Sequence, residues 1–205
     1  MEECSHGTNS PRIEAHDSSA KRTTSTGQVT DLTIYYDIFE TPFGWMGLLA
    51  SDKGLRNTTL PQNSPDICYE ELGPEMVGAV QDSDRFDELR QRIIGYFEGD
   101  PETFEDVPVD LEDASEFYLA AWRACQSIPH GETRTYGWLA DQAGNPRAPR
   151  AAGQSMARNR LAIIVPCHRV VASDGSLRGF GKGTTQLGLK RQLLNLEVGQ
   201  FTQQI

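Results

Sequence analysis

The sequence predicts an α/β protein of the α+β kind, in which a small β-rich unit precedes a mostly helical one. Between positions 31 and 60, β-branched and aromatic runs are split by turn signals at 42–44 and 51–54, which favours a small antiparallel sheet. Beyond position 115 the apolar residues recur at helical spacing. Charge divides in the same way, because residues 1–117 hold 8 Lys+Arg against 25 Asp+Glu and residues 118–205 hold 11 against 4.

This charge division leaves two interpretations open. The halves are either two solvated surfaces of different pI or an acidic domain followed by a basic binding module. The overall charge of -10 by itself argues against a nucleic-acid partner, so the second interpretation depends on motifs.

Composition narrows the class of protein. A hydrophobic fraction of 38% in 205 residues suffices for an ordinary core, and no apolar run is long enough to span a membrane. The N-terminus lacks the apolar segment of a secretory signal, so we expect a cytoplasmic protein, or a nuclear one in a eukaryote. The four cysteines form no CxxC pair, and neither a disulfide framework, a metal nor a cofactor is expected.

Three regions are expected along the chain: a disordered tail at 1–30, an N-terminal α/β domain at 31–107 and a second domain at 108–205. Residues 60–80 are expected to form a loop. Apolar spacing predicts a helix from Phe86 that stops at Gly99, and another over 116–129 in which Cys125 is a small buried residue.

Two short helices, 135–144 and 149–159, flank the turn "NPRAP" and form a helix-turn-helix pattern. Helical hairpins are also frequent in proteins that never bind DNA. The arginines of this segment strengthen the DNA interpretation, because no acidic residue lies between Asp141 and Asp174.

The stretch "LAIIVPCHRVV" predicts a strand over 161–166 that leads into Cys167 and His168, followed by a glycine-rich loop and a closing helix at 184–197. A cysteine becomes a nucleophile only as thiolate and therefore needs a base or a positive neighbour. Neighbouring residues on a strand point to opposite faces, so either the strand ends at Pro166 or a water bridges the pair. For most Cys-His dipeptides the better interpretation is a buried thiol beside a hydrogen-bonded histidine, and spacing alone does not exclude it here.

The segment "IIVPCHRVVASDGSLRGFGKGTTQLGLKRQLLNLE" resembles the active-site segment of the O6-alkylguanine-DNA alkyltransferases, whose hallmark is Pro-Cys-His-Arg-Val. "IPHGETRTYGWLADQAGNPRAPRAAGQSMARN" resembles the helix-turn-helix of the same family. The similarity covers about residues 108–198, and "TPFGWMGLLASDKGL" is similar to the family's N-terminal domain. The resemblance implies an RNase H-like N-terminal domain and a winged-helix-like C-terminal one.

For the chemistry, the resemblance implies that Cys167 irreversibly accepts the alkyl group, that His168 takes its proton through a water, and that Glu197 orients the imidazole. Asn159 would tie the recognition helix to the active-site segment. Tyr136 would lie beside the phosphate of the extruded nucleotide. The implied substrate pocket contains Met156, Val170, Phe180 and Gly181.

For DNA, the resemblance implies a monomer that binds duplex DNA containing O6-alkylguanine, and no membrane. Arg150 would fill the space left by the flipped nucleotide, while small residues let the helix approach the minor groove closely. The implied DNA contacts are Tyr136, Arg147, Arg150, Ala151, Gly153, Arg158 and Arg169.

The implied reaction is a single-turnover, suicidal transfer from O6-alkylguanine, and from O4-alkylthymine, by a methylated-DNA–protein-cysteine S-methyltransferase. Some family members carry Tyr where this chain has Phe180 and a hydroxyl residue at Gly181, and glycines there suggest room for alkyl groups larger than methyl. The alternative is an alkyltransferase-like protein that binds the lesion without chemistry, but the similar sensors replace the cysteine. Two further classes are less favoured. A transcriptional activator would need a metal-binding cysteine cluster, and a thiol hydrolase would need an oxyanion hole; neither motif is visible in the sequence.

Overall fold

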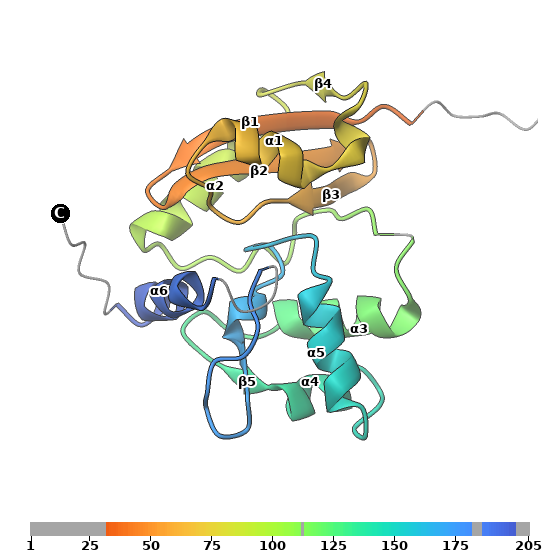
Figure 1. Cartoon of the computed structure of the whole chain (residues 1–205), viewed down its shortest axis with the longest axis vertical. Helices are drawn as coiled ribbons and strands as arrows, with labels where there is room; N and C mark the ends of the chain where they lie inside the picture. The colour runs from red at the N-terminus through yellow and green to blue at the C-terminus, as the bar shows by residue number, and fades with distance from the viewer. Residues whose placement is uncertain (1–31, 112, 182–185, 200–205) are drawn as a thin grey trace, which may run out of the picture. The chain divides into compact units, whose positions relative to one another are not determined.

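The computed structural model describes residues 32–111, 113–181 and 186–199 (Figure 1). The tail predicted at 1–30 therefore lies outside the described residues. Within the described ranges, no helix combines the length and the apolar character that crossing a membrane requires.

The N-terminal part contains a four-stranded sheet of order β3-β2-β1-β4 (Figure 1). The antiparallel neighbours β1, β2 and β3 confirm the expected small sheet, and β4 joins β1 in parallel. The elements of this part are β1 (Tyr35–Thr41), β2 (Gly44–Ser51), β3 (Gly54–Thr58), α1 (Pro65–Leu72), a 3-10 turn (Pro74–Met76), β4 (Val80–Gln81) and α2 (Asp87–Glu98).

The sheet buries both of its faces, because successive side chains of a strand point to opposite sides. On β2, Leu48 belongs to the main core together with Phe97 of α2. The next residue, Leu49, packs in a smaller cluster with Leu72 of α1. The two helices thus cover opposite faces of the sheet (Figure 1).

The expectation of a loop over 60–80 is wrong, because α1 lies within it. Ser64 caps the helix by accepting a hydrogen bond from the Ile67 amide, and Pro65 occupies the first turn. Gly73 follows the last residue. These residues are typical of helix ends and could have predicted the helix from the sequence, whereas the helix is too short to show a clear apolar period.

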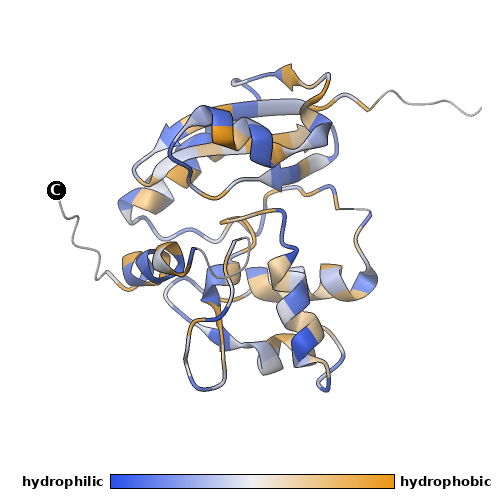
Figure 2. Ribbon diagram, in the orientation of Figure 1, coloured by the Kyte–Doolittle hydropathy of each residue, from blue (hydrophilic) through white to orange (hydrophobic). Residues whose placement is uncertain are grey.

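The C-terminal part is mostly helical, and α4 and α5 form the predicted helix-turn-helix. Trp122 of α3 donates its indole hydrogen to the Ser155 carbonyl of α5 at 2.9 Å, and Cys125 is fully buried as expected. Figure 2 shows hydrophobic and hydrophilic positions mixed along α5 and α6, as expected of helices with one buried face. The elements are α3 (Glu116–Gln126), β5 (Arg134–Thr135), α4 (Tyr136–Gln142), α5 (Pro149–Ala157), a 3-10 turn (Cys167–Arg169), β6 (Val170–Val171) and α6 (Leu187–Glu197).

The predicted strand at 161–166 is absent. The Val165 amide instead donates to the Leu161 carbonyl at 2.8 Å, and Ile163 takes a positive φ of 71°. All five residues from 161 to 165 are buried, so their apolar character reflects burial in a tight turn rather than a strand.

This buried turn joins the two parts of the described chain. Thr58, at the end of β3, donates its amide to the Arg160 carbonyl at 2.7 Å and its hydroxyl to the Ala162 carbonyl at 2.8 Å. Core residues of both parts also belong to one cluster. The domain boundary at 107/108 stays a prediction.

We expect Gly54→Ala to destabilise the protein much more than Gly78→Ala. Both glycines have positive φ, which an alanine adopts at a cost of about 1 kcal/mol. At Gly54 an added Cβ would also lie 2.5 Å from the Pro108 carbonyl oxygen, whereas nothing lies within 4 Å at Gly78. Urea unfolding should show an additional loss of about 2 kcal/mol for Gly54→Ala. Equal losses would contradict this packing.

Candidate active site

Cys167 begins a 3-10 turn directly after Pro166. Its amide donates to the Val165 carbonyl at 2.7 Å, and the Arg169 amide donates to the Pro166 carbonyl at 2.8 Å. A 3-10 turn has three residues per turn, so Cys167 and His168 point in different directions without lying on opposite faces. Cys167 and His168 thus lie in a turn and not on a strand, so the opposite-face geometry of a regular strand does not apply to them.

The side chain of Cys167 is partly exposed and lines two cavities. One, of about 110 Å³, is lined by Tyr136, Gly153, Met156, Ala157, Cys167, Gly179, Phe180 and Gly181. The other, of about 420 Å³, also reaches Leu60 and Asn57 of the N-terminal part. Three of the four expected pocket residues therefore lie beside the thiol. Val170 does not line either cavity and is fully buried instead.

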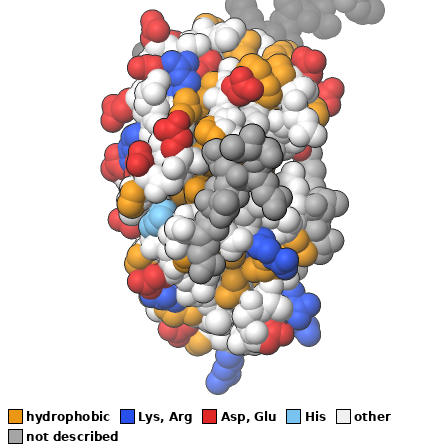
Figure 3. Space-filling model, turned by 90° about the vertical axis from the view of Figure 1, so that its left-hand side faces the viewer, with side chains coloured by type: hydrophobic (Ala, Val, Ile, Leu, Met, Phe, Trp, Pro, Cys, Tyr) orange, Lys and Arg blue, Asp and Glu red, His pale blue; other side chains and the backbone are white. Residues whose placement is uncertain are grey.

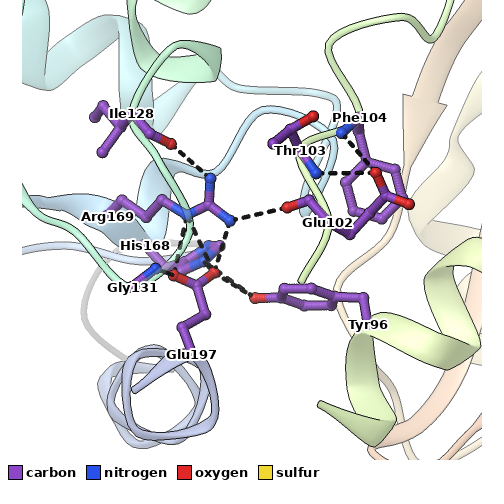
Figure 4. Close-up of polar contacts among 9 residues, drawn as sticks. All are labelled: Tyr96, Glu102, Thr103, Phe104, Ile128, Gly131, His168, Arg169 and Glu197. Carbon is purple, nitrogen blue, oxygen red and sulfur yellow. Dashed lines mark hydrogen bonds and ion pairs between the residues drawn. The ribbon is translucent and has the colours of Figure 1, made fainter. Parts of the chain in front are cut away.

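The carboxylate of Glu197 is the centre of a buried hydrogen-bond network (Figure 4). Its Oε1 lies 2.7 Å from Nε2 of His168 and 2.8 Å from the donating hydroxyl of Tyr96. Arg169 donates to both carboxylate oxygens from Nε at 3.0 and 3.1 Å and to Oε1 from Nη2 at 2.9 Å. The amide of Gly131 donates to Oε2 at 3.1 Å. All these groups are held in fixed positions.

The other imidazole nitrogen of His168, Nδ1, is buried and has no hydrogen-bond partner in the described part of the chain. A neutral imidazole carries one hydrogen. Because Nε2 faces a carboxylate that can only accept, the hydrogen belongs on Nε2 and Nδ1 carries a free lone pair. With this lone pair, Nδ1 of His168 is able to accept a proton.

The network around Glu197 corrects one expected DNA contact. Arg169 is 2% exposed, and its guanidinium also donates to the Ile128 carbonyl at 2.7 Å. A guanidinium satisfied in the interior is not available to phosphate, so Arg169 is a structural partner of Glu197. Its place next to His168 in the sequence gave no sign of this burial.

The other expected DNA residues lie on or next to α5. Arg147, Arg150 and Arg158 are exposed, and Arg158 donates to the hydroxyl of Tyr118. Gly153 lies against the Tyr136 ring, where an added Cβ would come within 3.8 Å. Figure 3 shows acidic side chains mainly in the upper part of one face and basic side chains more often toward its lower end.

Asn159 connects α5 with the segment before the cysteine. Its Nδ2 donates to the Val165 carbonyl at 2.9 Å, and its Oδ1 accepts from the Leu161 amide at 2.9 Å. These two hydrogen bonds fix the tight turn that places Cys167.

Comparison with known proteins agrees with this arrangement. A model described as "6-O-methylguanine DNA methyltransferase, ribonuclease-like domain" matches residues 34–111, and the DNA binding domain of the same name matches residues 116–199. The methylated-DNA–protein-cysteine methyltransferase of Methanosarcina acetivorans is 38% identical over 164 residues, which are 80% of this chain and 98% of the relative. The chain belongs to the 6-O-methylguanine DNA methyltransferase family.

Solved structures of this family show the same fold. The crystal structure of Mycobacterium tuberculosis O6-methylguanine methyltransferase has a TM-score of 0.68 and 34% identity, and the match covers 83% of this chain and 96% of that one. The structure of OGT from the same organism in complex with DNA has a TM-score of 0.67 and 35% identity, covering 82% and 96%. The N-terminal part is therefore the ribonuclease-like domain of the family.

The electrostatics of this family member favour neutral forms of both the thiol and the imidazole. Burial raises the pKa of Cys167, although Asn159 and Lys190 partly offset it. Burial likewise lowers the pKa of His168 in spite of the Glu197 carboxylate. For Glu197, burial would raise the pKa, but hydrogen bonds from His168 and Arg169 outweigh it and hold the pKa far below the ordinary value. The thiol of Cys167 and the imidazole of His168, the next residue in the chain, are thus both favoured in their neutral forms.

Sequence reasoning missed two buried polar side chains near the cysteine. Tyr96 was hidden in the apolar stripe of the predicted helix at 86–98. Lys190 is fully buried and donates from Nζ to the Val170 carbonyl at 2.7 Å and the Arg178 carbonyl at 3.2 Å. It shares one helix face with Leu193 and Glu197, and this spacing was a readable signal.

Glu197→Gln is expected to lower the free energy of unfolding by about 3 kcal/mol at neutral pH, since Arg169 would stay buried without its counter-charge. The folded pKa of Glu197 lies below the unfolded one, so this stabilisation is full above pH ~4.3 and is lost as the pH falls toward the folded value. Urea unfolding at several pH values tests both points.

The control is Glu132→Gln, which removes an exposed ion pair with Arg134 and should cost at most about 1 kcal/mol. Equal losses from the two substitutions would contradict a buried, structurally essential carboxylate.

Proposed function

We propose that this protein repairs DNA by direct reversal, transferring the alkyl group from O6 of guanine, and from O4 of thymine, to Cys167 in a single turnover. The observation that carries the proposal is the partly exposed Cys167 at the wall of a cavity of about 110 Å³, followed in the chain by His168, which pairs with Glu197 and whose free Nδ1 can accept a proton. Membership of the methyltransferase family supports it.

The reaction is a one-step displacement. Sulfur forms a bond to the alkyl carbon while the bond from that carbon to O6 breaks, and the thiol proton passes through a water to Nδ1 of His168. The guanine leaves with the electron pair and regains a proton from its surroundings. Tyr136 lines the cavity, and burial raises its pKa to about 12, so its hydroxyl stays a donor near the phosphate and the departing base.

Access to the thiol requires the nucleotide to leave the base stack, at a cost of a few kcal/mol. Arg150 is exposed at the first turn of α5 and is suited to fill the vacated space. The neighbouring Ala151 and Gly153 keep this helix narrow, which suits close approach to a minor groove. The partner is thus duplex DNA. The protein acts where that DNA lies, in the cytoplasm or, in a eukaryote, in the nucleus.

The product is a thioether, for which water is no effective nucleophile, so each molecule reacts once. A lesion sensor without chemistry would have no use for a thiol at this position. Cys167 and its paired base therefore favour the transferase over the sensor.

Mixing the protein with duplex DNA that contains O6-methylguanine should add one methyl group per molecule, because the thioether is not regenerated. Intact mass and peptide analysis should locate the methyl on Cys167. Cys167→Ala should abolish the transfer, whereas Cys68→Ala, which removes a buried thiol of the N-terminal domain, should leave it intact. Tight lesion binding by an unmodified wild-type protein would contradict the proposal.

Arg150→Ala should slow repair of duplex DNA by roughly tenfold or more while leaving the reaction with free O6-benzylguanine nearly unchanged, because the free base needs no flipping. Rates on both substrates give the measurement. Arg191→Ala removes an exposed arginine of α6 and is the matched control. Equal losses on both substrates would rule out the proposed role of Arg150.

A further inference from the structure

Tyr96 carries a polar group of the N-terminal domain into the buried network of the C-terminal domain (Figure 4). It lies on α2 and is 1% exposed. Its hydroxyl oxygen is 2.8 Å from Oε1 of Glu197 and 3.2 Å from Nε2 of His168. The N-terminal domain thus contacts both members of the pair that is proposed to act on the thiol.

The hydroxyl of Tyr96 acts as a donor in this contact. Burial and the nearby Glu197 raise its pKa well above the ordinary value, so the phenol keeps its proton at any working pH. Its single hydrogen points to Glu197, since a carboxylate accepts more strongly than any other neighbour. Oε1 of Glu197 then accepts from Tyr96, His168 and Arg169 at once.

Donors from these three residues compete for the negative charge of Oε1. Each additional donor stabilises the carboxylate and weakens its pull on the imidazole hydrogen. The hydroxyl also fixes where the carboxylate oxygen lies, and this position selects the tautomer of His168 with hydrogen on Nε2. Removing the hydroxyl would strengthen the interaction of Glu197 with a charged imidazole and raise the pKa of His168.

We propose that Tyr96 is a positioning residue for alkyl transfer, which holds Glu197 so that His168 stays neutral with its Nδ1 free to accept the thiol proton. This inference rests on the proposed function and deepens it, because it gives the ribonuclease-like domain a part in the chemistry. Through Tyr96, that domain helps to position the His168–Glu197 pair of the C-terminal domain.

The pH dependence of this base reflects several groups. Glu197 and Lys190 of α6, Arg169 of the 3-10 turn and Tyr96 of α2 act on His168. The ring of His130 also contacts the Tyr96 ring in an edge-to-face arrangement, with centroids 6.2 Å apart. Tyr96→Phe leaves all the ionisable neighbours in place and removes only the hydroxyl.

Tyr96→Phe should move the acidic limb of the rate against pH upward by about one pH unit, so that methyl transfer slows several-fold on that limb, on the acidic side of neutral pH. At higher pH the rate should recover, because His168 is again neutral. The ring should still pack against Phe97 and Phe104. Tyr69→Phe removes an exposed hydroxyl of α1 and is the matched control.

Nuclear magnetic resonance of histidine-labelled protein reports the His168 tautomer and its pKa directly. Wild type should show a neutral imidazole with hydrogen on Nε2 at pH 7, and Tyr96→Phe should show a raised pKa. A wild-type His168 with hydrogen on Nδ1 would overturn the inference even where the variant does not fold.

The two proposals fail in different ways. Wild-type protein that leaves Cys167 unmethylated refutes the proposed function. Wild-type protein that methylates Cys167, with an identical pH profile and His168 pKa in Tyr96→Phe, refutes only the role of Tyr96.

Discussion

The buried carboxylate of Glu197 is the group on which the rest of the site depends. An ionised carboxylate in the interior is strongly destabilising unless its oxygens are satisfied. Here they accept from Tyr96, Gly131, His168 and Arg169, which come from three separate segments of the chain. α2, the turn before β5, the 3-10 turn and α6 must therefore come together before the carboxylate is stable. The position of His168 follows from that convergence, so the fold and the base are set by the same contacts.

The charges of this network explain how a thiol can wait without reacting. Burial keeps both the imidazole and the thiol neutral, and Arg169 offsets part of the attraction that Glu197 exerts on a proton at His168. A free thiolate would react with many electrophiles. In a protein that reacts once, every such reaction would consume the molecule. A neutral pair becomes charged only when an alkyl carbon is in place to accept the sulfur, which links reactivity to the bound substrate.

The sequence predicted the antiparallel strands, α2 to α6 and three of the four residues expected to line a pocket at the thiol, because these rest on local periodicity, on turn residues and on a distinctive motif. It mispredicted what depends on tertiary contacts. The buried turn at 161–165 resembles a strand, since burial and β-structure favour the same residues. Arg169 is of a residue type that often contacts DNA phosphates, and only its contact with Glu197 in the folded protein shows that its side chain points into the interior. Tyr96 lies in an apolar stripe, and no local signal indicates that its hydroxyl meets a residue of another domain.

Among the described residues, the groups that the acidic N-terminal domain contributes to this network are neutral. Glu102 illustrates how: its backbone carbonyl accepts from Arg169 at 3.4 Å, while its carboxylate is held by Arg92 at 3.0 Å. A second carboxylate beside Glu197 would stabilise the imidazolium and raise the pKa of His168. The histidine would then be protonated at neutral pH and unable to take the thiol proton. A phenol and a carbonyl supply the hydrogen bonds that the site needs without this charge, so a domain rich in acidic residues can support a neutral base.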